Sequence, residues 1–133
     1  MGWDAYATQN GKPLEKVHAE DSGTMPADPN LQVAFCTACD EVKRRSGSGA
    51  NLGTTTLGGP FQDMFERGTG CRFGGESDLL EWTSDEVQRV QQQSDWNFTV
   101  EQGDQSGELW EYWTARLFLE TCATNELGIL FTW

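Results

Sequence analysis

The chain has 133 residues, which is enough for one hydrophobic core and too short for two ordinary domains. Hydrophobic residues make up 37% of it and aromatic residues 11%, and this apolar content excludes wholesale disorder. The formal charge of −12, from 21 acidic and nine basic residues, disfavours direct binding to nucleic acids and anionic membranes, because both are negatively charged.

The location expected for the chain is the cytoplasm, or the host cell cytoplasm if the chain comes from a phage. The N-terminal residues lack the basic and apolar regions of a secretory leader. No apolar run approaches the roughly 18 residues that indicate a membrane span.

The acidic residues are concentrated in the second half of the chain. Residues 76–133 hold twelve acidic residues against Arg89 and Arg116, a net charge of −10. Such a negative field attracts basic surfaces, which favours a basic protein partner. The competing interpretation is that the acidity only keeps a small protein soluble and monomeric.

The first 27 residues predict a β-hairpin followed by a loop. Residues 3–8 form the first strand, and Asn10-Gly11 is the pair most typical of a two-residue hairpin turn. The return strand is expected at residues 14–17, with Pro13 marking an edge position. Residues 19–27 are expected to form a polar loop.

A helix is predicted after Asp28, which has the side chain of an N-cap and is followed by Pro29 at the first helical position. The residues from Lys43 to Arg45 complement the dipole at its C-terminus, and Gly47 ends it. The apolar residues at helical spacing are Leu31, Phe35, Ala38 or Cys39, and Val42.

The middle of the chain predicts one short helix between two glycine-rich connections. Residues 46–59 are expected to form a long mobile loop. Pro60 begins the short helix, and residues 68–75 form the second connection. The apolar residues of this helix are Phe61, Met64 and Phe65.

The last third predicts two helices and two strands. A capping box at residues 83–86 opens a helix that ends near Gln93. Residues 96–101 alternate apolar and polar side chains as a half-buried strand does. Residues 108–124 form the central core helix, and residues 128–133 form the last strand. We therefore expect a single α+β domain, with a small antiparallel or mixed sheet packed against about four helices.

The cysteines and the one histidine do not form a convincing metal or redox motif. Cys36 and Cys39 have metal-ligand spacing, but Cys71 and Cys122 lie 51 residues apart, and a structural zinc site usually has two close pairs. His18 has no recognisable catalytic partner in sequence. No metal, cofactor or catalytic residue is therefore expected.

Both ends of the chain resemble small uncharacterised bacterial and phage-type proteins. The similar segments are residues 1–7 (MGWDAYA), residues 112–122 (YWTARLFLETC), and Gly128 with the closing Phe131-Thr132-Trp133. The resemblance implies no activity or catalytic residues. Short acidic phage proteins often bind and block a host protein, sometimes by imitating the charge of DNA, so it favours an inhibitory or anti-defence role.

The first hypothesis is a non-enzymatic acidic module, possibly a DNA-mimic-like decoy, that docks on a basic host protein. Trp82 is predicted to be its exposed anchor, because tryptophan is enriched in binding hot spots. The predicted partner-binding residues are Asp78, Glu81, Trp82, Asp85, Glu86, Asp104, Glu108 and Glu111.

The alternative hypothesis is a site for a small anion or nucleotide, in a sequestering protein or a small enzyme. Two long glycine-rich loops in so small a domain suggest a ligand. His18, Arg67 and Arg72 would bind it. A third hypothesis is a structural subunit of a larger assembly.

Overall fold

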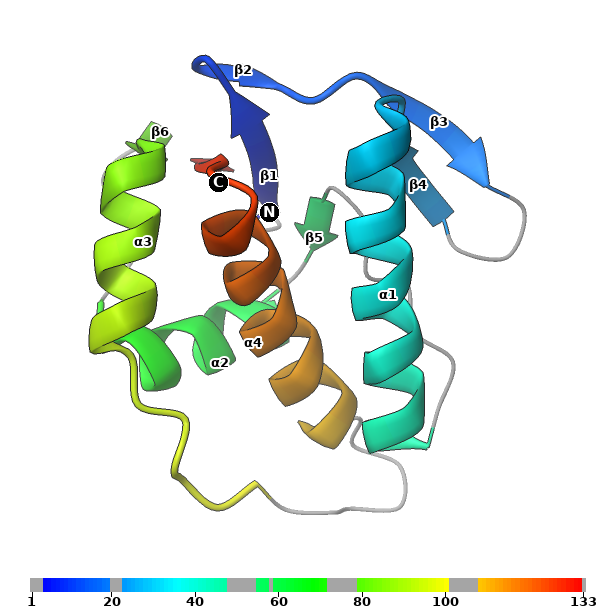
Figure 1. The fold of residues 1–133 in the computed structure, drawn as a ribbon. Coiled ribbons are helices and arrows are strands. Elements are labelled where there is room, and N and C mark those ends of the chain that lie inside the picture. The colour runs from blue at the N-terminus through cyan, green and yellow to red at the C-terminus, as the bar shows by residue number, and fades with distance from the viewer. Residues whose placement is uncertain are drawn as a thin grey trace.

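The computed structural model describes residues 4–19, 23–47, 55–57, 59–71, 79–100 and 108–132. Over these residues the α+β class is confirmed, with helices in contact with an antiparallel sheet (Figure 1). The elements are β1 (Asp4–Gln9), β2 (Lys12–Pro13), β3 (Lys16–Ala19), β4 (Gly23–Pro26), α1 (Pro29–Ser46), β5 (Thr55–Leu57), α2 (Gly59–Thr69), β6 (Leu79–Trp82), α3 (Ser84–Gln93), α4 (Glu108–Thr124) and β7 (Gly128–Thr132).

The main sheet has the strand order β2-β1-β7-β6, and every pair in it is antiparallel. β5 is a further partner of β1 and lies on the edge opposite β7, where it pairs Thr55 with Tyr6. Asn10 and Gly11 both have positive φ, at 54° and 78°, as a type I′ turn requires. The predicted hairpin turn is therefore confirmed.

The predicted return strand at residues 14–17 and the polar loop at 19–27 are wrong. The pairing of β2 with β1 ends at Pro13, apart from one further bond from the Leu14 N–H to the Ala7 carbonyl at 3.1 Å. Residues 16–19 form β3, which pairs instead with β4 in a separate two-stranded sheet. Met25 of β4 is buried and connects this second sheet to the hydrophobic core.

The main sheet buries one face, and the register shows which residues form it. Ala5 pairs with Phe131 and Ala7 with Ile129, and all four are buried. On β6, Trp82 pairs with Ile129 and is also buried. Since side chains alternate along a strand, the exposed Glu81 lies on the opposite face.

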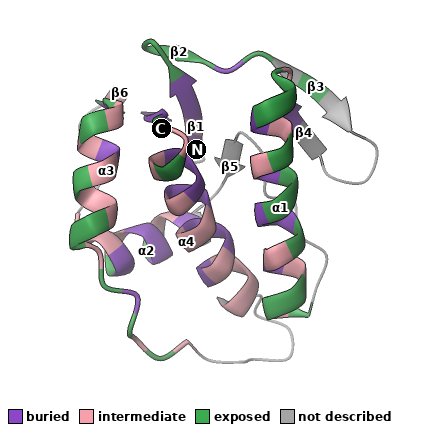
Figure 2. Cartoon of the chain, in the orientation of Figure 1, coloured by how far each residue is buried: buried purple, intermediate pink, exposed green. Residues whose placement is uncertain are grey.

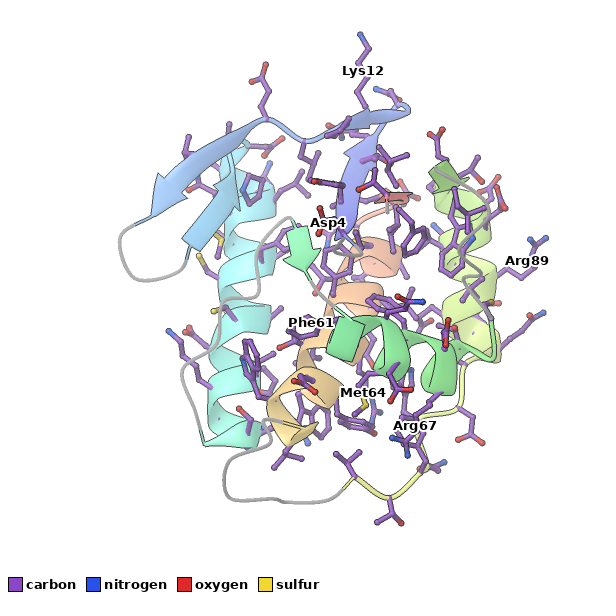
Figure 3. All side chains as sticks on the ribbon, turned by 180° about the vertical axis from the view of Figure 1, so that it is seen from behind. Asp4, Lys12, Phe61, Met64, Arg67 and Arg89 are labelled. Atoms are coloured by element: carbon purple, nitrogen blue, oxygen red, sulfur yellow. The ribbon has the colours of Figure 1, made fainter. Side chains whose placement is uncertain are left out.

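Helix α4 is the central helix, as predicted. It runs between α1 and α3 and also contacts α2 (Figure 1). Figure 2 shows that exposed residues are concentrated on α1 and α3, whereas α4 is mostly buried or intermediate. Figure 3 shows from behind that α2 crosses the lower part of the molecule and carries Phe61 and Met64, which are both buried.

The helix boundaries of α1 and α3 follow local signals. The Asp28 side chain accepts a hydrogen bond from the backbone N–H of Asn30 at 2.8 Å, and Gly47 ends α1 with φ 72°. Thr83 and Glu86 form the predicted capping box of α3. The residues predicted to face inward from α1 are all buried: Leu31, Phe35, Ala38, Cys39 and Val42.

Residues 96–100 do not form the predicted strand. The burial alternates as expected, with Trp96 buried and Asn97 exposed, but the backbone is irregular. Trp96 packs over Gly68, whose Cβ, if present, would lie 2.3 Å from the indole ring. The Trp96 carbonyl accepts a hydrogen bond from the Tyr112 hydroxyl at 2.6 Å. Packing on helices, and not pairing in a sheet, therefore produces the alternation.

The predicted loops are shorter than expected where the structure describes them. Residues 55–57 of the predicted loop 46–59 form β5, and α2 extends over Gly68 to Thr69. Residues 48–54 and 72–75 lie outside the described residues. Strand β6 was not predicted at all.

Candidate functional site

A polar pocket of about 490 Å³ lies where three chain reversals meet at one end of the main sheet. These are the β1–β2 turn, the β6–α3 junction and the α4–β7 turn, and Figure 1 shows β2, β6 and the C-terminal segment at this same end of the molecule. We call it the sheet-end pocket. Its lining includes Thr8, Asn10, Glu81, Thr83, Asn125 and Glu126.

The α4–β7 turn brings Glu126 to the sheet-end pocket. The Leu127 N–H donates to the Cys122 carbonyl at 2.8 Å and the Glu126 N–H to the Ala123 carbonyl at 3.3 Å, the two bonds of a Schellman motif. Glu126 occupies the left-handed position of this motif with φ 56°, where glycine is usual. A glutamate at this position carries a backbone cost that a glycine would avoid.

Glu81 contributes the second carboxylate of the pocket. Its Oε1 lies 3.5 Å from the position that a Cβ would take on Gly11, so the carboxylate lies against the tip of the β1–β2 turn. Glu81 and Glu126 are both exposed, and within the described residues neither forms an ion pair.

Thr8 and Gly128 form the inner part of the pocket. A Cβ on Gly128 would lie 2.6 Å from both the Thr8 Oγ1 and the Trp82 carbonyl oxygen, so only glycine fits there. Thr8 is 2% exposed. Thr8 lines the pocket, and its hydroxyl is not among the buried side-chain atoms that lack a hydrogen-bond partner in the described residues.

The N-terminus of α3 also lines the pocket, but a carboxylate of the same helix already compensates the positive end of the helix dipole. The Glu86 carboxylate accepts hydrogen bonds from the Thr83 N–H at 3.2 Å and from the Thr83 hydroxyl at 3.1 Å. Asp85 lies in the same first turn and is exposed. Since no Lys, Arg or His among the described residues lines the pocket, its electrostatic character suits a cation.

The structure brings together four of the eight predicted partner-binding residues. Glu81, Asp85 and Glu86 lie at the β6–α3 junction with Trp82. The prediction that Trp82 is an exposed anchor is wrong, because the residue is only 7% exposed and its ring packs 4.8 Å from that of Phe131.

The other four predicted residues do not join this cluster. Glu108 and Glu111 lie in the first turn of α4, at the opposite end of the molecule from β6 (Figure 1). Asp78 and Asp104 lie outside the described residues. Among the described residues, the acidic residues predicted to form one surface therefore lie at two opposite ends of the molecule.

Glu126 and Thr8 are the residues that sequence reasoning missed. Glu126 falls between the predicted helix at residues 108–124 and the predicted strand at residues 128–133, and a carboxylate at such a chain reversal is the sequence signal for this site.

The arginines of α1, α2 and α4 are engaged in ion pairs away from the pocket. Arg45 Nε lies 2.5 Å from Glu41 Oε1, and Arg44 binds the same carboxylate. These hydrogen bonds lower the pKa of Glu41 to about 2. The remaining pairs are Arg116 with Glu120 at 3.3 Å and Arg67 with Asp63 at 3.9 Å.

Arg116 also connects α4 to the irregular segment that follows α3. Its Nη1 donates to the Tyr112 hydroxyl at 3.0 Å, and that hydroxyl donates to the Trp96 carbonyl. Partial burial lowers the Arg116 pKa, but its bonds to Tyr112 and Glu120 outweigh this and raise the pKa overall. This arginine serves the packing of the core.

The residues of the alternative anion site are not gathered. Arg67 donates to the Thr99 carbonyl at 3.3 Å and stacks 4.4 Å from the centre of the Phe98 ring. It lies at the far end of α2, across the molecule from β3, which carries His18 (Figures 1 and 3). Arg72 lies outside the described residues.

The four cysteines lie on two helices, α1 and α4, and just after the end of a third, α2. Cys36 is exposed, Cys39 and Cys122 are buried, and burial raises the pKa of the Cys122 thiol. Among the described residues, no three His, Cys, Asp or Glu side chains are grouped so that they could hold a metal ion.

In the part of the chain that the structure describes, no helix has both the length and the apolar character needed to cross a bilayer. Comparison of the chain with family models, with curated proteins and with solved structures finds no match.

Proposed function

We propose that this protein is an acidic binding module that docks the end carrying the sheet-end pocket on a basic surface of another protein. The observation that carries the proposal is the position of the unpaired carboxylates. Glu81, Asp85 and Glu126 are exposed around one pocket and have no ion-pair partner in the described residues, whereas the arginines of α1, α2 and α4 are already paired.

Charge complementarity is the physical basis of such docking. Several carboxylates on one end of a molecule with a net charge of −12 steer a basic partner toward that end. Attraction of this kind mainly accelerates association and selects partners, and it weakens as salt screens the charges. A protein whose groove binds nucleic acid presents the required basic surface, so an inhibitory decoy of the phage type is the biological role that we favour.

The proposal is tested with two variants of equal charge. Glu81→Gln with Glu126→Gln removes two carboxylates from the pocket, and Glu15→Gln with Asp40→Asn removes two exposed carboxylates outside it. Each protein is immobilised and incubated with cell lysate at low and at high salt, and the retained proteins are identified.

We expect the wild type and the control variant to retain the same basic protein at low salt, and the pocket variant to lose it. Retention should also fall at high salt. If both double variants lose the partner equally, only total charge matters and the docking end is wrongly assigned. If retention is insensitive to salt and to both variants, the proposal is wrong.

A further inference from the structure

We infer that the junction of β4 and α1 binds one soft monovalent metal ion, of the class of Cu(I), through sulfur atoms. The ligands are Met25 of β4 and Cys36 and Cys39 of α1. The strand packs directly on the helix, which brings the methionine to the two cysteines (Figure 1). None of the three residues lines the sheet-end pocket, so the inference does not depend on the proposed function.

The sulfur atoms of Cys36 and Met25 already lie at the separation that a shared ion requires. The Cys36 thiol donates to Met25 Sδ, and the two sulfur atoms are 3.8 Å apart. Two sulfur ligands that hold one ion at about 2.3 Å, at an angle between tetrahedral and trigonal, lie about 3.8–4.0 Å apart. A soft cation therefore takes the place of the thiol proton between these two atoms without a movement of either residue.

Cys39 contributes the third sulfur from the next turn of α1. It follows Cys36 by three residues, and side chains at this spacing are neighbours on a helix surface. Cys36 is exposed, whereas Cys39 and Met25 are each only 1% exposed. An ion therefore enters from the surface at Cys36, and the other two residues shield it from water on its inner side.

A ligand set made only of sulfur selects a soft ion. Thiolate and thioether ligands suit Cu(I), whereas carboxylate and carbonyl oxygens suit Mg²⁺ and Ca²⁺. Structural zinc sites take four Cys or His ligands, and the described residues offer no group of even three His, Cys, Asp or Glu side chains. Cu(I) accepts a lower coordination number and a thioether ligand, so it fits where zinc does not.

Binding also displaces protons. Cysteine binds a metal as the thiolate, so Cys36 and Cys39 each release a thiol proton to water when the ion enters, and no electron is transferred. The affinity for Cu(I) should therefore fall as the pH is lowered.

The test is a competition for Cu(I), which is supplied without oxygen as its complex with a chromogenic chelator, by the reduced full chain. We expect the wild type to take up one equivalent. Cys36→Ala and Met25→Leu should each weaken the affinity about ten-fold or more, because even residues outside a coordination sphere change metal affinity by about 10–100-fold. Cys71→Ser is the matched control, because Cys71 follows α2 and lies outside the site.

X-ray absorption of the wild type loaded with Cu(I) gives a measurement that does not depend on the folding of a variant. We expect only sulfur atoms around the ion, at about 2.3 Å. Nitrogen or oxygen ligands in this spectrum would show that the assigned ligand set is wrong.

Three results of the competition would overturn the inference. If Cys71→Ser weakens uptake as much as Cys36→Ala, the ion binds any accessible thiol and there is no defined site. If folded Met25→Leu retains the wild-type affinity, the thioether is not a ligand. If Zn(II) displaces Cu(I) at equal concentration, the site is not selective for a soft monovalent ion. None of these results affects docking through the sheet-end pocket, which the lysate experiment tests separately.

Discussion

Replacing Glu126 with glycine is expected to stabilise the fold and to weaken binding at the same time. Glu126 holds a left-handed backbone with φ 56°, which costs an L-residue about 1–2 kcal/mol. Glycine avoids this cost but loses about 0.5–1 kcal/mol through its greater freedom in the unfolded chain. The net gain in the free energy of unfolding is about 0.5–1 kcal/mol, which corresponds to a rise in Tm of roughly 2–4 °C at this chain length.

The assay is urea unfolding of the wild type, Glu126→Gly and Glu126→Ala, followed by circular dichroism. Glu126→Ala also removes the carboxylate but retains the left-handed strain, so it should gain no stability. Both variants should lose affinity for the basic partner. A Glu126→Gly protein that is less stable than the wild type by 1 kcal/mol or more would show that the carboxylate supports the fold, and the reasoning would be refuted.

Three further predictions concern the core and the helix ends. Trp82→Ala should reduce the free energy of unfolding by about 3–5 kcal/mol, because the indole is buried against Phe131. Tyr112→Phe should reduce it by about 1–3 kcal/mol, because the Trp96 carbonyl loses its donor; both losses are measured by urea unfolding. Glu41→Gln should lower Tm at pH 7, because the arginine contacts lower the pKa of the Glu41 carboxylate to about 2 in the folded state. The difference in Tm from the wild type should disappear as the pH falls from about 4.5 to about 2.

Each of these predictions has an outcome that contradicts it. A loss within about 0.5 kcal/mol for Trp82→Ala would be typical of an exposed residue and would restore the anchor hypothesis. An unchanged Tyr112→Phe protein would mean that water replaces the hydroxyl. A Tm difference for Glu41→Gln that persists at pH 2 would show that the ion pairs are not its cause.

The elements that were predicted correctly are those whose signals are local. Asp28 and Gly47 set the ends of α1 through bonds to backbone groups within a few residues. The Thr83 capping box acts in the same way for α3, and Asn10-Gly11 sets the hairpin turn. In each case the residues that determine the conformation lie next to one another in the sequence, so no knowledge of distant contacts is needed.

The elements that were missed depend on distant contacts. Strand β6 exists because it pairs with β7, which follows it by almost fifty residues, and β5 exists because it pairs with β1. The alternation at residues 96–100 arises from packing over Gly68 and below Tyr112, yet it has the same period as a strand. The many acidic residues in the second half of the sequence likewise indicated an acidic surface. Which of their carboxylates lie close together is determined by the chain reversals at the end of the sheet.

The hypothesis that the acidity serves only solubility does not account for one feature of the sheet-end pocket. A charge needed for solubility can lie at any exposed position, so it does not require Glu126 in a backbone conformation that favours glycine. The left-handed backbone of Glu126 reduces stability in the free protein, and costs of this kind persist at sites where a ligand compensates them. Binding of a basic partner compensates this cost, because it uses the carboxylate that the strained turn positions.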